Sequence, residues 1–168
     1  MKKQKGFSLI ELLIVVAIIL IIAAIAIPNL LKSKMAANES SAVGSLRTIN
    51  TGQVTYAASC PANGYSVSLV ALQTGGACQS GANIIDNVLG GADPSTKSGY
   101  TFAYTAGAPD ASGVISSYTL NGTPITLNVT GNRMFCTDQS GVIRYTPNAA
   151  GCTVPAVTTG LGGSPALQ

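Results

Sequence analysis

An uninterrupted apolar stretch from Phe7 to Ile27 constrains this chain more than any other feature. It is 21 residues long, contains a single charged residue, Glu11, and follows the lysine-rich leader 1–6. A helix of about 20 residues rises about 30 Å, which matches the hydrocarbon thickness of a bilayer. We therefore expect the stretch to span a membrane. Because an acidic group in lipid is costly, Glu11 is expected to have a function.

The positive charge of the chain is concentrated in the leader. The whole chain carries a net charge of +3, and Lys2, Lys3 and Lys5 account for all of it, because the remaining six basic residues balance the six acidic ones. A basic surface that would bind nucleic acid is therefore not expected. Lysines beside a span stay on the cytoplasmic side, so the chain after residue 28 is expected to lie on the opposite side of the membrane.

The residue before the apolar stretch indicates unusual processing. In a secretory signal the small residue at the cleavage site follows a shorter apolar run, whereas here Gly6 precedes the run. The sequence Gly6-Phe7-Ser8-Leu9-Ile10-Glu11-Leu12 resembles the prepilin cleavage and methylation motif of type IV pilins and type II secretion pseudopilins. The resemblance is detailed over residues 5–31. It implies that a prepilin peptidase cuts between Gly6 and Phe7, that Phe7 is N-methylated, and that Glu11 guides assembly.

The apolar stretch is expected to continue into one long helix over roughly residues 8–58. Apolar residues recur at spacings of three and four beyond Pro28, as in an amphipathic helix: Leu31, Met35, Ala42, Val43, Leu46, Ile49 and Tyr56. Pro28 cannot donate to the carbonyl of Ala24 and clashes with it, so we predict a kink around residues 24–28. The alternative is that Pro28 ends the membrane helix. We expect a filament-core half at 7–28 and an amphipathic half at 29–59.

The chain after the helix is expected to form a small α+β head. Residues 60–98 are expected to be a connecting loop, with helical turns near 65–72 and 84–89. Tyr100, Phe102 and Tyr104 alternate with smaller residues, which predicts a strand within a sheet region at 99–152. Further strands are expected at 114–121, 133–137 and 142–146, with a hairpin turn at 138–141. Pro124 predicts an edge or bulge, and residues 153–168 are expected to be a flexible tail.

The fold that follows is the pilin fold of the resembling family. It would place the second half of a long kinked helix against an antiparallel sheet of three or four strands.

The four cysteines are expected to form disulfides. Cys60, Cys78, Cys136 and Cys152 lie in the part of the chain expected to be exported, and an even count there is typical of disulfides. Four cysteines allow three pairings. We favour 60–78 with 136–152, because each closes a short local loop. Each bond would contribute about 3 kcal/mol on the chain-entropy model.

The residues that usually perform chemistry are scarce. The sequence has no histidine and no CxxC pair, so a zinc site is not expected. It also lacks a nucleophile elbow and a phosphate-binding glycine loop. We expect no cofactor, no metal and no enzymatic activity.

The resemblance implies a structural function. It favours the major subunit of a type IV pilus, which waits in the inner membrane with a cytoplasmic leader and a periplasmic head. An assembly machinery then polymerises it with copies of itself into a helical extracellular filament for adhesion, motility or DNA uptake. A type II secretion pseudopilin or a minor pilin is the alternative. A membrane-anchored binding head that does not polymerise is a third hypothesis, of a different class.

Overall fold

The computed structural model describes residues 7–75, 78, 83–147, 151–153 and 166–167. The chain divides into two compact units, residues 1–34 and residues 35–168, and the second is called the head below. The predicted leader, including Gly6, lies outside the described residues, as does most of the predicted tail.

Helix α1 (Leu9–Ser59) is continuous over 51 residues and agrees with the predicted limits to within one residue at each end. It continues through Pro28, so this proline does not end the membrane helix. Around it, side chains supplement the backbone ladder. The Asn29 amide donates to the Ile25 carbonyl at 3.1 Å, and the Ser33 hydroxyl donates to the Asn29 carbonyl at 3.0 Å. The kink at Pro28 stays a prediction.

Two short helices follow α1 in the region expected to be a connecting loop. Helix α2 (Leu69–Thr74) is preceded by Ser68, whose hydroxyl accepts a hydrogen bond from the Ala71 N–H. Helix α3 (Asn87–Gly90) is preceded by Asp86, whose carboxylate accepts one from the Leu89 N–H. Each helix thus has a side-chain acceptor at its N-cap, just before its first residue, which satisfies a backbone donor that the helix itself cannot pair. They lie close to the two predicted helical turns.

The head contains a five-stranded antiparallel sheet in the order β1-β2-β3-β4-β5. The strands are β1 (Ser95–Lys97), β2 (Tyr100–Ala106), β3 (Tyr118–Pro124), β4 (Arg133–Asp138) and β5 (Arg144–Pro147). The α+β class is confirmed, but the predicted strand number of three or four was too low. The additional strand is β1, which pairs with the start of β2 and lies within the expected loop 60–98. Three residues are too few for alternation to be visible in a sequence.

Strand β3 corrects a second expectation. Pro124 suggested an edge or bulge, yet β3 lies between β2 and β4. Pro124 is the last residue of the strand, and β4 pairs with β3 only from Thr119 to Gly122. Because no residue of β4 pairs with β3 at Pro124, the missing N–H of the proline leaves no carbonyl of β4 without a donor. Strands β4 and β5 are joined by the predicted turn at 138–141, in which the Gly141 N–H donates to the Asp138 carbonyl at 2.9 Å.

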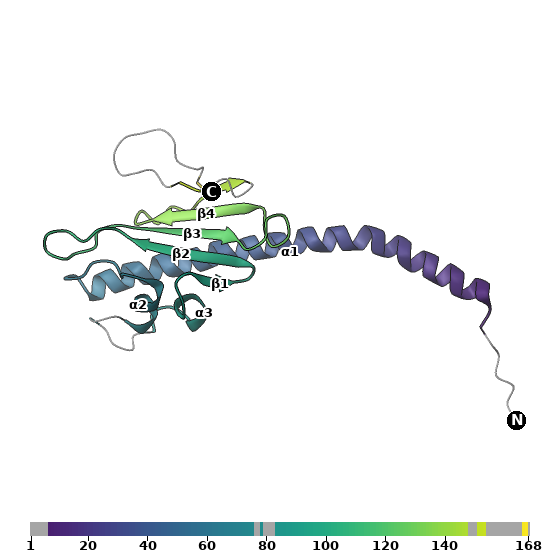
Figure 1. The fold of residues 1–168 in the computed structure, drawn as a ribbon, viewed down its shortest axis with the longest axis horizontal. Helices are drawn as coiled ribbons and strands as arrows, with labels where there is room; N and C mark the ends of the chain where they lie inside the picture. Colours follow the sequence, from purple (N-terminus) through teal and green to yellow (C-terminus); the bar gives the residue numbers. More distant parts are fainter. Residues whose placement is uncertain (1–6, 76–77, 79–82, 148–150, 154–165, 168) are drawn as a thin grey trace, which may run out of the picture. The chain divides into compact units, whose positions relative to one another are not determined.

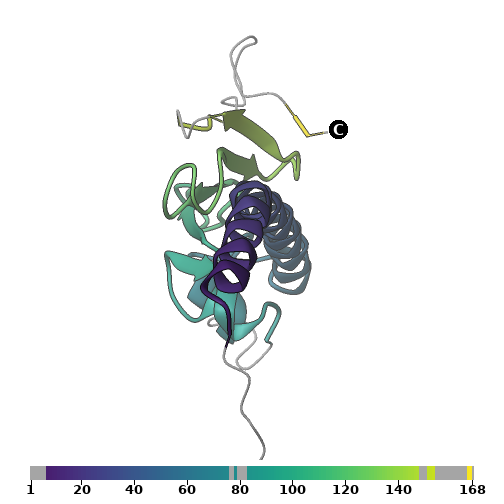
Figure 2. The same ribbon diagram turned by 90° about the vertical axis from the view of Figure 1, so that its right-hand side faces the viewer.

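The core of the head lies between the sheet and the later half of α1 (Figure 1). Tyr100, Phe102 and Tyr104 alternate with more exposed residues along β2 and all three are buried. From α1, apolar residues of the predicted stripe join them: Ala42, Leu46, Ile49 and Tyr56. Leu31, at the start of the predicted stripe, is exposed. The view at right angles in Figure 2 shows the strands of the sheet beside the blue, head half of α1.

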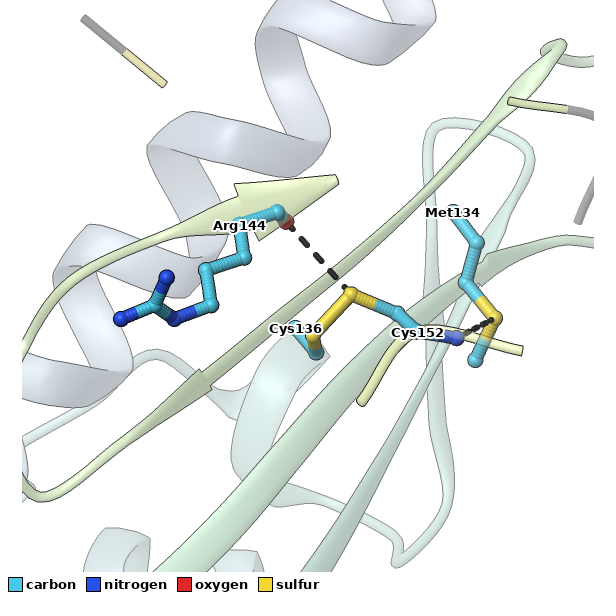
Figure 3. The surroundings of a disulfide bond; sticks show 4 residues. All are labelled: Met134, Cys136, Arg144 and Cys152. Atoms are coloured by element: carbon cyan, nitrogen blue, oxygen red, sulfur yellow. Dashed lines mark hydrogen bonds between the residues drawn. A yellow bond between two sulfur atoms is a disulfide. The ribbon is translucent and has the colours of Figure 1, made fainter. Parts of the chain in front are cut away.

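Two disulfides close local loops of the head, Cys60–Cys78 and Cys136–Cys152, which confirms the favoured pairing. The second bond connects residue 152 to β4 next to β5 (Figure 3). There the Cys152 N–H donates to the Met134 sulfur at 3.3 Å. Further along, the Leu167 N–H donates to the Ile143 carbonyl at 2.8 Å, and Ala166 bridges to Arg144. At Ala166 and Leu167 the predicted flexible tail is in fact docked.

Candidate assembly surface

The first half of α1 exposes apolar side chains around its whole circumference. Every large apolar side chain described from Phe7 to Leu31 is at least 46% exposed, and Phe7 reaches 81%. The helix is long and apolar enough to cross a membrane, and none of its most apolar segment is buried. Since so large an apolar surface is unfavourable in water, it needs lipid or other protein around it.

Glu11 lies in the first turn of this apolar helix. Its carboxylate Oε2 accepts a hydrogen bond from the Ser8 N–H at 3.3 Å, and the Leu12 N–H donates to the Ser8 carbonyl at 3.3 Å. Ser8 and Glu11 thus form one half of a capping box, in which the third helical residue caps the backbone that precedes the helix. An acidic group here also lies at the positive end of the helix dipole. The remaining hydrogen-bonding capacity of the carboxylate is not used by any described residue.

The structure places the predicted site residues in two groups. Phe7 and Glu11 lie four residues apart at the start of α1, and Pro28 lies within the same helix. The four cysteines all belong to the head. Gly6, the first residue of the predicted cleavage pair, lies outside the described residues.

Sequence reasoning missed a set of buried polar residues on the head half of α1. The Glu39 carboxylate accepts from the backbone N–H groups of Asn132 and Arg133 at 2.8 and 3.1 Å, and it pairs with the Arg133 guanidinium at 2.7 Å. Arg133 also lies over the rings of Phe135 and Tyr145, each centroid 5.5 Å away. These contacts fasten α1 to the start of β4.

Asn50 and Gln53 make comparable contacts further along the helix. The Asn50 amide donates to the Thr137 hydroxyl at 2.9 Å and accepts from the Tyr118 hydroxyl at 3.0 Å. The Gln53 side chain donates to the Ser66 hydroxyl and accepts from its N–H, at 2.7 and 3.0 Å. A signal was present in the sequence, because all three polar residues lie three or four positions from Ala42, Leu46 or Ile49. They therefore share the inward face.

Burial changes the acid–base behaviour of the head. It raises the pKa of the Tyr100, Tyr104 and Tyr118 phenols well above the usual value. Tyr118 also packs against two other rings, Tyr65 at 4.9 Å and Tyr104 at 5.6 Å between centroids. Near α3, a hydrogen bond from Lys97 at 2.9 Å lowers the pKa of Asp86. These shifts accompany packing, and the described residues contain no cluster of three or more groups suited to holding a metal.

Comparisons with known proteins concern the same N-terminal region. The model of the prokaryotic N-terminal methylation motif matches residues 1–27. The type IV major pilin protein PilA of Myxococcus xanthus is 48% identical over 54 residues, which cover 32% of this chain and 24% of that protein. The N-terminus of this chain therefore carries the prokaryotic N-terminal methylation motif and is similar to that of a type IV major pilin. With the α+β head described above, the architecture of the chain is pilin-like.

A second pilin is also similar at this N-terminus. The type IV wide pilus major component PilA4 of Thermus thermophilus is 60% identical over 40 residues, 24% of this chain and 30% of that protein. The match therefore spans about a quarter to a third of the length of these two relatives. No solved structure matches the chain significantly.

Proposed function

We propose that this chain is the structural subunit, the major pilin, of a type IV pilus. One observation carries the proposal: an apolar helix exposed on all sides follows a prepilin-type motif and has a single carboxylate in its first turn. Such a helix suits two surroundings, the lipid of a membrane and the interior of a bundle of identical helices. The precursor would be held in the inner membrane, and the filament would form when lipid contacts are replaced by helix contacts. The apolar surface then never meets water.

Maturation creates the group that Glu11 needs. Cleavage between Gly6 and Phe7 gives Phe7 a free α-amine, which is then methylated and stays cationic. In lipid, an acidic side chain costs about 2.5–3.5 kcal/mol at the helix centre on insertion scales, and less near the interface, where Glu11 of the first turn would lie. An amine from a neighbouring subunit removes that cost only when the two helices are staggered so that Glu11 of one meets Phe7 of the other. The pair therefore sets the register of assembly.

The contacts of Glu11 are consistent with this function. Within its own chain the carboxylate has one backbone donor at 3.3 Å, the Ser8 N–H, which is a long hydrogen bond. The capping contact would hold the side chain at the end of the helix before assembly. A cationic amine is a stronger partner than a neutral N–H, because charge-assisted hydrogen bonds are roughly twice as strong.

Pro28 would serve the transfer from lipid to filament. The helix has no backbone donor at this residue, so the Ala24 carbonyl lacks its usual partner, and bending there costs less than elsewhere. The leader would be cytoplasmic and the head periplasmic until assembly. The activity proposed for the filament is adhesion, motility or DNA uptake. We propose no catalytic role.

The test is to shear surface filaments from cells that make this protein and to identify their main component by mass. The proposal predicts an abundant protein that begins at Phe7 and is one methyl group heavier at its N-terminus. A matched Glu11→Ala strain should keep the protein in the membrane but lose the filaments.

Other outcomes would replace the proposal. If the protein is absent from sheared fibres but copurifies with a secretion complex, it is a pseudopilin. A trace amount in fibres made mainly of another subunit indicates a minor pilin. Full function of the Glu11→Ala protein as a membrane-bound monomer indicates an anchored binding head.

A further inference from the structure

A groove runs along the head half of α1. Its first part has a volume of about 470 Å³ and is lined by α1 from Ala36 to Arg47, by Arg133 and by Leu167. Its second part, about 360 Å³, is lined by α1 from Arg47 to Val54 and by Gly141 of the β4–β5 turn. Arg47 is common to both parts, and the two together are called the Arg47 groove below. It belongs entirely to the head.

Arg47, which lines both parts of this groove, is a cation that no described residue pairs with. Its side chain is exposed and forms no ion pair or hydrogen bond with any residue that the structure describes. The second guanidinium in the groove, Arg133, is already neutralised by Glu39 at 2.7 Å. The lining of the groove therefore carries one net positive charge, that of Arg47, and no described residue of the head pairs with it.

Gly44 opens the groove next to this cation. A Cβ added at Gly44 would meet no atom within 4 Å, so the packing of the described head does not require a glycine there. A glycine inside a helix costs about 1 kcal/mol relative to alanine. Gly44 therefore weakens the helix with no packing benefit inside the described head. It leaves an open place on the surface, against which a neighbouring molecule could pack closely.

Among the described residues of the head, one exposed acidic side chain has no cation partner and could pair with Arg47. Glu39 pairs with Arg133 and Asp86 pairs with Lys97. Both carboxylate oxygens of Asp93 accept backbone N–H groups, from Leu69 and Tyr104, and Asp138 is buried in the β4–β5 turn. Asp110 is exposed, has no cation partner among the described residues, and uses only Oδ1.

Asp110 lies at the tip of a hydrogen-bonded turn between β2 and β3. Its Oδ1 accepts the N–H groups of Ser112 and Val114 at 2.8 and 3.0 Å, its own N–H donates to the Val114 carbonyl, and its carbonyl accepts from Gly113. Pro109 and Ile115, which flank the tip, also form an isolated antiparallel β-bridge. The tip residues Asp110, Ala111, Ser112 and Gly113 are small. A preorganised acidic tip loses little freedom on docking, which favours binding.

We propose that the Arg47 groove is a contact between heads, which receives the Asp110 tip of a second copy of this chain. Oδ2 of Asp110 would pair with the Arg47 guanidinium, and the small tip residues would lie over Gly44. The contact is heterologous, because the groove and the tip are different surfaces, so it continues from copy to copy and suits a filament instead of a closed dimer. This inference rests on the proposed filament, in which it adds a contact between heads to the packing of the apolar helices.

The experiment uses sheared filaments and a carbodiimide, which joins a carboxylate to an amine in direct contact without a spacer. Arginine does not react, so the wild-type filament gives the background level of dimers, including any that join the Phe7 amine to Glu11 of a neighbour. In Arg47→Lys filaments we expect a new covalent dimer on denaturing gels, with a peptide that joins position 47 of one subunit to Asp110 of another. The Lys97–Asp86 pair, at 2.9 Å within one head, is an internal control for the reaction in every sample.

The matched control is Arg47→Lys combined with Asp110→Asn. Asparagine keeps a side-chain oxygen for the Ser112 and Val114 N–H groups, so the tip keeps its turn while the reactive carboxylate is removed. The dimer should fall to the wild-type level.

Three results would overturn the inference. One is the absence of the 47–110 peptide while Lys97 and Asp86 are joined. Another is a dimer that stays above the wild-type level after Asp110→Asn. The third is a 47–110 peptide that is found only within single subunits. Each leaves the filament itself intact. A chain that never appears in filaments would instead refute the proposed function.

Discussion

The two glutamates of α1 differ in how completely their own chain satisfies them. Glu39 lies in the head half of the helix, where its side chain is 9% exposed and pairs with Arg133 and two backbone N–H groups. Glu11 lies in the apolar half and has one backbone contact at 3.3 Å. A saturated carboxylate stabilises the fold, whereas an undersaturated one in apolar surroundings is available to another molecule. One helix thus contains a structural acid and an acid that is suited to assembly.

The largest expected effect separates these two acids. Glu11→Gln removes the charge that the neighbouring Phe7 amine would meet, so we expect filaments to be lost while the thermal unfolding of the head is unchanged. Electron microscopy of sheared fractions and circular dichroism of the detergent-solubilised protein provide the two measurements. Normal filaments from Glu11→Gln would show that the comparison is wrong. The matched control is Ser33→Ala, on the exposed surface of the same helix. Glu39 is unsuitable as a control because it stabilises the head.

The second prediction compares apolar residues of the two halves. Leu46 is fully buried against the sheet, so Leu46→Ala should destabilise the head by about 2–5 kcal/mol. Ile18 is 53% exposed in the apolar half, and Ile18→Ala should leave the unfolding temperature of the head within error while weakening the filament. Thermal unfolding in detergent measures the first effect, and resistance of the filament to heat or detergent measures the second. Equal destabilisation of the head by both variants would contradict the division into halves.

The third prediction concerns Glu39. Glu39→Gln keeps the shape of the side chain but removes the charge that binds Arg133, which is itself 41% exposed. We expect the head to lose about 1–3 kcal/mol, because charge-assisted hydrogen bonds contribute more than neutral ones while solvent screens the exposed partner. Denaturant unfolding measures the loss. Filaments should still form under conditions where the variant head is folded, and their absence there would assign Glu39 a role in assembly.

The smallest effect is a loss of head stability in alkali. Burial raises the pKa of Tyr100, Tyr104 and Tyr118, so the folded head holds these phenol protons more tightly than the unfolded chain does. The resulting stabilisation is complete below about pH 10, the usual tyrosine value, and is lost as the pH rises above it. Ultraviolet absorbance of the phenolate should rise together with unfolding, and Tyr118→Phe should remove part of that late rise. Ionisation of all tyrosines before unfolding would contradict this prediction.

Local patterns in the sequence were sufficient for the elements whose physics is local. An apolar stretch of 21 residues with one acid near its start, after Gly6, predicted the helix and the motif that the comparisons confirm. Spacing of three and four predicted the end of α1, and alternation predicted β2. The two disulfides followed from loop length, because nearby cysteines meet at a low entropic cost. None of these required knowledge of a distant partner.

Only the tertiary structure decided the features that depend on partners far along the chain. Ser95–Lys97 is a strand because the start of β2 pairs with it, and Pro124 ends a central strand because β4 stops pairing at Gly122. Glu39, Asn50 and Gln53 lie on the inward face of α1 by their spacing, but spacing does not show that each is buried with its hydrogen bonds supplied by the head. The sequence determined which half of α1 must leave water. Burial of the polar residues in the other half depended on partners between 13 and 94 positions away, whose positions the folded sheet and the loop after α1 supply.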